Sequence, residues 1–132
     1  MGIRRITIDE AEAKPATSPI FLGNVASQDL VPEGVADILR VTAVTFRDGA
    51  RNKRHQHSTD QVLVATAGEG FVADDDGILA LKPGDVAFIA KNTPHWHGAR
   101  PNQDFTHLSI LTPGHMDILE DSGQNLTDSA PT

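Results

Sequence analysis

The sequence contains no cysteine, so neither a disulfide nor a thiolate metal site is available to it. Any bound metal ion would therefore be held by histidine, carboxylate or amide groups. No stretch approaches the roughly 18 consecutive apolar residues of a membrane-spanning helix. The first residues, MGIRRITIDEAEAK, turn acidic before any long apolar run, which argues against a secretory signal. We therefore expect a cytoplasmic protein with no membrane partner.

Basic residues are scarce as well. The chain has 18 Asp and Glu against 11 Lys and Arg, a formal net charge of −7 at pH 7. Nucleic acids and anionic membranes are bound by basic surfaces, so we expect neither as a partner. The 132 residues are enough for one compact domain with a core of its own.

Long helical periodicity is also missing, and the apolar residues form short runs of strand length instead. These runs occupy residues 38–46, 61–67, 70–73, 78–81, 85–90 and 106–111. Gly, Pro, Asn or Asp lies at nearly every junction, and Asp76-Gly77 between two apolar runs predicts a hairpin turn. This pattern predicts an all-β sandwich or barrel.

The chain is predicted to form one domain in three parts. Residues 1–37 are less regular, with IRRITI and SPIFLG as candidate strands that cover a sheet edge. Residues 38–111 form the barrel. Residues 112–132 are predicted to hold a short helical turn in GHMDILED and a polar, mobile tail.

Six histidines carry the chemical signal, and five of them lie in or beside predicted strands. His55 and His57 point to one face of a strand by its period of two, and Gln61 has the same parity. His95 and His97 form a second pair, and His107 lies on the last predicted strand. Imidazole pairs on one strand face can bind one metal ion, and an amide oxygen can complete the ligand set. One HxH pair alone is a common chance pattern, but five such histidines in a small all-β domain favour a site.

These residues resemble the two motifs of the cupin superfamily. The first motif is matched by Gly49, His55, His57, Gln61 and Gly68, and the second by the spacing of Gly84, Ala90, Asn92 and His95. The resemblance implies a double-stranded β-helix, a jelly-roll-like barrel, with a metal held by His55, His57, Gln61 and His95. Three residues depart from the usual pattern: Gln61 replaces Glu, Ala90 replaces Pro and Asn92 replaces Gly. Asn tolerates the left-handed backbone that Gly provides there.

The segment KPGDVAFIAKNTPHWHGARPNQDFTHLSI is similar to small single-domain cupins associated with carboxymuconolactone decarboxylase, a group that includes manganese-dependent hydroxynitrile lyases. The resemblance implies that His97 and His107 are non-ligand histidines beside the substrate, as catalytic residues. It implies Thr42 and Val44 as pocket lining. It also implies a homodimer, formed through an added edge strand for which IRRITI is the candidate.

The expected cofactor is one divalent transition metal, with Mn or Fe preferred and Zn, Ni and Co admitted by the same ligands. A His3Gln set supplies no negative charge, which favours an anionic or deprotonated substrate. Together with His97 and His107, whose unperturbed pKa is about 6.5, this predicts lyase-type acid/base chemistry on a small oxygenated molecule. The alternatives are an Fe(II) dioxygenase, an isomerase, and a non-catalytic cupin that binds a metal or small ligand.

The remaining features are interpreted as structural. Phe46, Phe71 and Phe88 are expected in the core. Trp96 has the opposite parity to its flanking histidines and is expected on the outer face or at a subunit interface. The basic run at residues 51–54 is expected in a solvated loop, and His115 on the surface.

Overall fold

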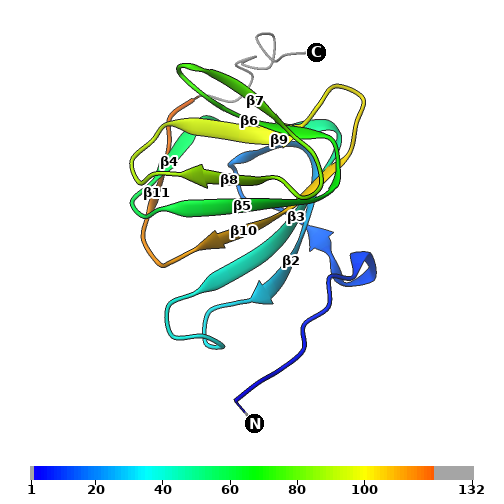
Figure 1. Cartoon of the computed structure of the whole chain (residues 1–132), viewed down its shortest axis with the longest axis vertical. Helices are drawn as coiled ribbons and strands as arrows, with labels where there is room; N and C mark the ends of the chain where they lie inside the picture. The colour runs from blue at the N-terminus through cyan, green and yellow to red at the C-terminus, as the bar shows by residue number, and fades with distance from the viewer. Residues whose placement is uncertain (1, 121–132) are drawn as a thin grey trace.

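The computed structural model describes residues 2–120, and within this range the protein is an all-β barrel with one short 3-10 helix (Figure 1). The helix η1 spans Glu10–Glu12. The strands are β1 Lys14–Pro15, β2 Phe21–Val31, β3 Arg40–Asn52, β4 His55–His57, β5 Gln61–Gly68, β6 Gly70–Asp74, β7 Gly77–Leu81, β8 Val86–Ile89, β9 His95–Ala99, β10 Phe105–Leu111 and β11 Met116–Ile118. The fold predicted from the sequence is confirmed.

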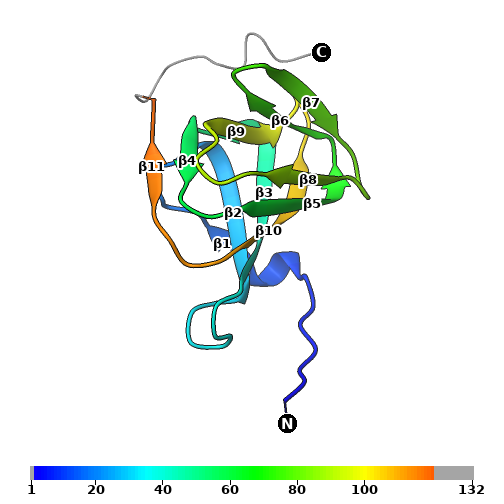
Figure 2. The same ribbon diagram turned by 60° about the vertical axis from the view of Figure 1, so that its left-hand side comes forward.

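The strands form two facing layers. One layer runs β2-β3-β10-β5-β8, and the other runs β4-β9-β6-β7 with β11 beside β4. The long strand β3 belongs to both, because its far end pairs with β9 at Arg51 and Gly98. Figure 2 shows the layers enclosing the barrel interior. In the described chain β7 pairs only with β6, and β8 only with β5, so the barrel is open between β7 and β8.

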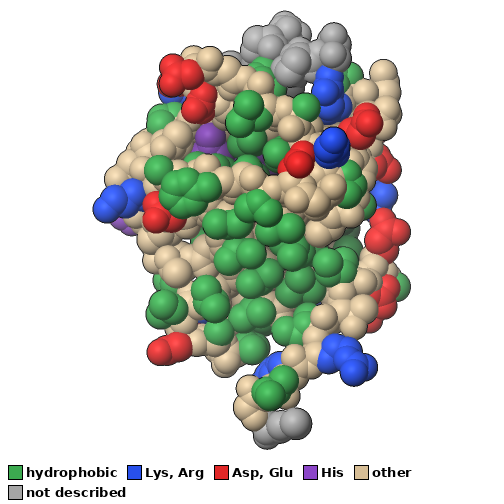
Figure 3. Space-filling view, viewed as in Figure 1, with side chains coloured by type: hydrophobic (Ala, Val, Ile, Leu, Met, Phe, Trp, Pro, Cys, Tyr) green, Lys and Arg blue, Asp and Glu red, His purple; other side chains and the backbone are tan. Residues whose placement is uncertain are grey.

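The side chains that point between the layers form the main core. Phe46, Leu63 and Phe105 are fully buried there, and the smaller residues Val44 and Ala65 pack around them. Alternate residues of β5 and β10 point outwards, and apolar side chains cover this outer side of the sheet (Figure 3). This alternation follows the period of two of a half-buried strand.

Two motif positions show why the backbone needs particular residues. Gly68 has φ 75°, and a Cβ on it would lie 2.0 Å from the carbonyl oxygen of Asp104. Asn92, which replaces the usual glycine, has φ 61°. The left-handed conformation expected of Asn92 before His95 is confirmed.

Three local predictions are wrong. Residues 116–118, expected in a helical turn, form β11, whose backbone pairs with β4 from Met116 to Ile118. Residues 3–8 are not part of a strand in this chain, although Gln28 anchors them by bonding Asp9 N and Thr7 O. The hairpin turn lies one residue earlier than expected, at residues 75–76, because Gly77 already pairs with Asp74. The proposed mobile tail lies outside the described residues, and the pairing of IRRITI with a second copy stays a prediction.

Two side-chain environments also differ from expectation. Phe46 and Phe71 are buried as predicted, but Phe88 is 66% exposed because it points outwards from the edge strand β8. Trp96 points away from the histidines as predicted, yet it is buried with Phe71 and Ala73 in a second, smaller cluster.

The basic run at residues 51–54 is not a solvated loop. Arg51 and Asn52 end strand β3, and both are buried. Arg51 forms a bidentate ion pair with Glu120, at 2.8 and 3.2 Å, and Glu120 also accepts the backbone N–H of Arg54. Parity along one strand gives no sign of a partner 69 residues away.

No helix among residues 2–120 is long and apolar enough to cross a membrane.

Candidate metal centre

Five histidines converge inside the barrel from three strands. His55 and His57 come from β4, His95 and His97 from β9, and His107 from β10. His55 and His95 pair directly across the two strands, and their ring centroids lie 4.3 Å apart. Ring nitrogens of His55, His95 and His97 all lie within 4.8 Å of one another, which indicates a three-histidine metal site.

Backbone carbonyls fix the orientation of His55 and His95. Nδ1 of His55 lies 2.6 Å from the carbonyl oxygen of Lys53, and Nδ1 of His95 lies 2.8 Å from that of Thr93. A carbonyl oxygen only accepts, so each neutral ring carries its proton on Nδ1 and keeps the lone pair of Nε2 for the interior. This outer hydrogen bond is typical of metal-binding histidines, because it fixes both tautomer and ring orientation.

Gln61 at the start of β5 brings an oxygen atom to the same place. Its Nε2 donates to Oγ of Ser109 at 2.9 Å, and its Oε1 lies 3.2 Å from Nε2 of His95. Since the proton of His95 is on Nδ1, two atoms with lone pairs face each other here. That contact is unfavourable unless a cation lies between them, and it is close to the spacing of about 3 Å expected for adjacent ligands each about 2.1 Å from one ion. The donor set therefore fits a metal ion.

His57 is the least enclosed member of the group. It is half-buried, and its ring centroid lies 5.0 Å from that of His55 and 5.8 Å from that of His95. Among residues 2–120, no backbone carbonyl holds its ring as those of Lys53 and Thr93 hold the other two. His57 therefore lies beside the predicted ligands, at the side of the cluster nearer to solvent.

His97 and His107 form a hydrogen-bonded pair deeper in the barrel. Nε2 of His107 lies 3.2 Å from Nδ1 of His97, and the ring of His107 packs against Phe46 and Phe105. His97 was expected as a non-ligand histidine beside the substrate, and the structure shows that its ring also contacts the side chain of Asn52. Nδ1 of His107 is buried without a hydrogen-bond partner among the described residues.

Burial lowers the pKa of every histidine in the cluster. Burial, with the neighbouring charge of His95, lowers the pKa of His55 to about 3 and that of His57 to about 4. Burial likewise lowers the pKa of His107 to about 4, and it lowers the pKa of His97 well below 6.5. The unperturbed value assumed from the sequence is therefore wrong for the last two. All are neutral at pH 7, the state in which imidazole binds metals.

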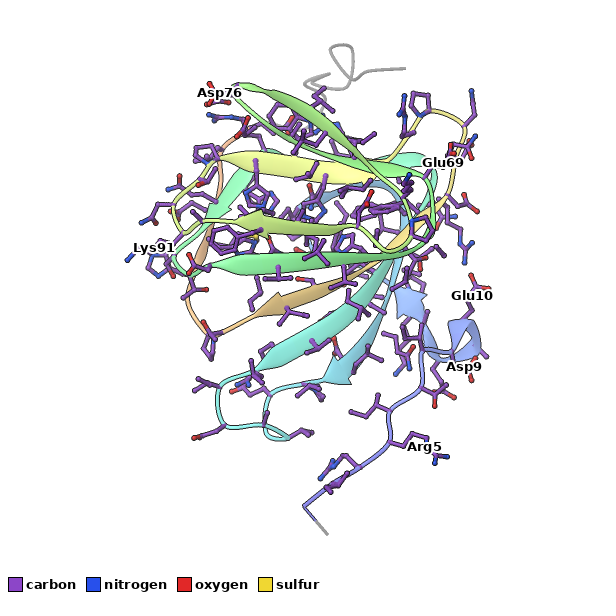
Figure 4. All side chains as sticks on the ribbon, viewed as in Figure 1. Arg5, Asp9, Glu10, Glu69, Asp76 and Lys91 are labelled. Atoms are coloured by element: carbon purple, nitrogen blue, oxygen red, sulfur yellow. The ribbon has the colours of Figure 1, made fainter. Side chains whose placement is uncertain are left out.

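The opening between β7 and β8 leads to the cluster. A cavity of about 900 Å³ lies there, with apolar walls that include Val72, Leu81 and Ile89, and His95 lines it. Aspartates 74, 76 and 85 also line it, and Figure 4 shows Asp76 at the tip of the β6–β7 hairpin. In Figure 3 histidine side chains are visible behind the surface at this level. The site is therefore reached through an apolar opening with an acidic rim.

Two residues predicted to line the pocket, Thr42 and Val44, and two unpredicted residues, Ser109 and Asn52, lie around the cluster. Val44 lies in the core opposite His107 in the strand register, and Thr42 is half-buried opposite Ser109. Their role as pocket lining stays a prediction. Ser109 lies two residues after His107 on β10, so the strand period could have predicted that both side chains point to the same face. Nothing in the sequence connects Asn52 with His97.

The family follows from comparison with known proteins. The cupin domain family model matches residues 42–111, the stretch that carries both histidine pairs and Gln61. The chain belongs to the cupin superfamily. An (R)-mandelonitrile lyase from Granulicella tundricola is 34% identical over 111 residues, which cover 83% of each protein. Of the solved structures, a cupin-like protein from Thermotoga maritima superposes with a TM-score of 0.81 at 32% identity, covering 89% of this cupin and 93% of that chain.

A second kind of enzyme is also similar to this cupin. An acireductone dioxygenase from Gluconacetobacter diazotrophicus is 30% identical over 107 residues, which cover 74% of this cupin but 59% of that enzyme. The polyketide cyclase RemF from Streptomyces resistomycificus shares the fold, with a TM-score of 0.76 at 16% identity. The proteins that resemble this cupin therefore include enzymes with different activities.

Proposed function

We propose that this cupin is a metal-dependent lyase that acts on a small oxygenated substrate in a hydroxynitrile-lyase-like reaction. The observation that carries the proposal is the contact between Oε1 of Gln61 and the unprotonated Nε2 of His95, which a cation bound between the two atoms would make favourable. The similarity to an (R)-mandelonitrile lyase over 83% of both chains supports the reaction class.

The ligands we assign are His55, His57, Gln61 and His95. His55 and His95 present Nε2 to the interior, Gln61 presents its carbonyl oxygen, and His57 lies beside them. All four are neutral, and the cluster of possible ligand groups in the described part of the chain contains histidines and no carboxylate. A divalent ion held there, Mn or Fe in our assignment, supplies Lewis acidity that polarises a hydroxyl or carbonyl oxygen.

The residues around this position act on the proton of the substrate. In the cleavage of a cyanohydrin, the hydroxyl proton is removed, the C–C electron pair leaves with the cyanide carbon, and a proton is returned to it. We assign the holding and return of that proton to His97 and His107, which are hydrogen-bonded to each other beside the predicted ligands. Their neutral state lets them accept a proton.

The cavity favours a substrate that is neutral on entry. Its walls are largely apolar, and its three aspartates repel an anion that approaches from solvent. A neutral hydroxyl compound passes this rim and becomes deprotonated only inside.

Metal analysis and a lyase assay test the proposal. The purified protein should contain close to one first-row transition metal per chain. His95→Ala should lose this metal, and His97→Ala should retain it. With racemic mandelonitrile as probe, the wild type should release cyanide and an aldehyde in equal amounts. Protein that holds its metal but turns over no cyanohydrin would refute the lyase assignment.

An Fe(II) dioxygenase is the second candidate, and the similarity to acireductone dioxygenases favours it. The same ligands leave positions for a substrate and dioxygen. Oxygen consumption by the Fe(II)-loaded protein with an enediol substrate would select this candidate. A cupin that only binds a metal or a small ligand would turn over neither substrate.

A further inference from the structure

Ser109 on β10 accepts a hydrogen bond from the side-chain amide of Gln61. Nε2 of Gln61 lies 2.9 Å from Oγ of Ser109. Ser109 pairs with Leu63 in the strand register, and Gln61 lies two residues before Leu63 on β5. Gln61 and Ser109 are therefore diagonal neighbours on the inner face of the sheet, and a long side chain can span that spacing.

A glutamine can bind a metal ion through only one end of its amide. The carbonyl oxygen carries lone pairs, whereas the NH₂ group only donates hydrogen bonds. The last torsion of a glutamine side chain is broad and roughly two-fold, so the rotamer alone does not select the end that faces the ion. The surroundings of Gln61 must therefore make this selection.

Those surroundings are closed to bulk solvent. Only 4% of Gln61 is exposed, and a buried donor without an acceptor is costly. When Oε1 of Gln61 faces the metal position, 3.2 Å from Nε2 of His95, the nitrogen of the amide faces Ser109. The hydroxyl oxygen of Ser109 then supplies the acceptor that this orientation needs.

The geometry points to Ser109 as a positioning residue that holds the carbonyl oxygen of Gln61 towards the metal ion. This inference rests on the proposed metal site but on no particular reaction. It also connects Ser109 with the unusual ligand at position 61. A glutamate would present an oxygen in either orientation and would have no N–H group to satisfy, whereas a glutamine needs an acceptor on the side away from the ion.

Loss of the hydroxyl should weaken metal binding. In the metal-free chain the side chain of Gln61 could then turn to another partner. In the metal-bound chain it could not, because Oε1 must stay at the ion, so its buried nitrogen would remain without an acceptor. Groups that orient a metal ligand in this way typically contribute about 10- to 100-fold to metal affinity.

Mn²⁺ alone is the probe, and the electron paramagnetic resonance signal of the free ion measures its binding to the chelator-treated full chain. Ser109→Thr and Ser109→Val form a matched pair, since both add volume but only threonine keeps the hydroxyl. Ser109→Thr should stay within about threefold of the wild-type affinity, and Ser109→Val should bind about 10-fold more weakly or worse. If Ser109→Val fails to fold, Ser109→Ala removes the hydroxyl without added volume and should also weaken binding relative to Ser109→Thr.

A Gln61→Ala background tests whether Ser109 acts through Gln61. There Ser109→Val should change the Mn²⁺ affinity by less than about twofold, because the amide that Ser109 holds is gone. A loss as large as that in the wild-type background would show that Ser109 acts on the fold in general, and it would overturn the inference. If Gln61→Ala binds no measurable Mn²⁺, the comparison of Ser109→Thr with Ser109→Val decides.

The outcomes separate this inference from the proposed function. Equal Mn²⁺ affinities of Ser109→Thr and Ser109→Val would overturn the inference, as would a Gln61→Ala variant that binds Mn²⁺ as tightly as the wild type. A wild-type chain that binds no Mn²⁺ would refute the metal site, and the inference with it. A chain that shows the expected affinities but cleaves no cyanohydrin would refute the lyase assignment alone.

Discussion

Acid should destabilise the metal-free protein, and His107 allows the effect to be calculated. His107 is fully buried, and burial lowers its pKa to about 4, only partly offset by the nearby backbone of Leu108. In the unfolded chain the pKa of a histidine is about 6.5. Below pH 6.5 the unfolded state therefore binds a proton that the folded state does not bind. Folding stability falls as the pH decreases from 6.5 towards 4.

The magnitude follows from the two pKa values. Between them the free energy of unfolding falls by about 1.4 kcal/mol per pH unit for one such histidine. Lowering the pH from 7.5 to 5 spans about 1.5 of those units, a loss of about 2 kcal/mol from His107 alone. This is a sizeable part of the 5–15 kcal/mol typical of a domain. The other buried histidines of the cluster act in the same direction.

Urea unfolding at pH 7.5 and pH 5, in the presence of a chelator and followed by Trp96 fluorescence, measures the effect. His107→Gln should reduce the stability difference between the two pH values by about 2 kcal/mol. The matched control is His115→Gln, because His115 is exposed, and it should leave the difference as in the wild type. If His107→Gln also leaves the difference unchanged, the argument from burial is refuted.

Three further predictions concern the fold and assembly. Glu120→Gln should lower the free energy of unfolding, measured in urea, by about 3 kcal/mol, since it removes the carboxylate from a buried, bidentate pair with Arg51. The control Asp75→Asn removes an exposed carboxylate that pairs with Arg54, and it should lower the free energy of unfolding by less than about 1 kcal/mol. Equal losses in the two variants would contradict the reasoning. Gly70→Ala places a Cβ 2.3 Å from the ring of Phe105 and should cost more than about 2 kcal/mol; an unchanged unfolding midpoint would show that the strand simply shifts. The homodimer implied by the cupin resemblance should sediment at twice the mass of the chain, and a monomer at micromolar concentration would refute it.

Most of the barrel could be predicted from local pattern. Each expected apolar run between residues 38 and 111 lies within a strand or extends at most two residues beyond it, because alternation along a half-buried strand is a local property of the sequence. The errors fall at the edges of the sheet. Phe88 sits on an edge strand, where one apolar side chain lacks a covering layer. Residues 116–118 pair with β4, and that partner is more than fifty residues away.

The sequence predicted which residues form the site, but not their burial, their pKa values or their hydrogen-bond partners. The spacing of His55, His57, Gln61 and His95 indicated one cluster, and the structure brings these residues together. The pKa values of the histidines could not be foreseen, because burial by the opposite layer lowers them. The roles of Lys53 and Thr93 depend on backbone carbonyls, which any residue type supplies.

By itself, the sequence determined that this protein is a β-barrel with a ring of histidines on the inner faces of its strands. Strand period, turn residues and motif spacing are encoded within short segments, so they can be read without knowing which strands pair. Only the tertiary structure decided which histidines meet and how deeply each one is buried. This depends on contacts between distant residues, such as the bond that Oδ1 of Asn52 accepts from the backbone N–H of His97, 45 positions apart. Such a contact exists only after the two layers have closed on each other.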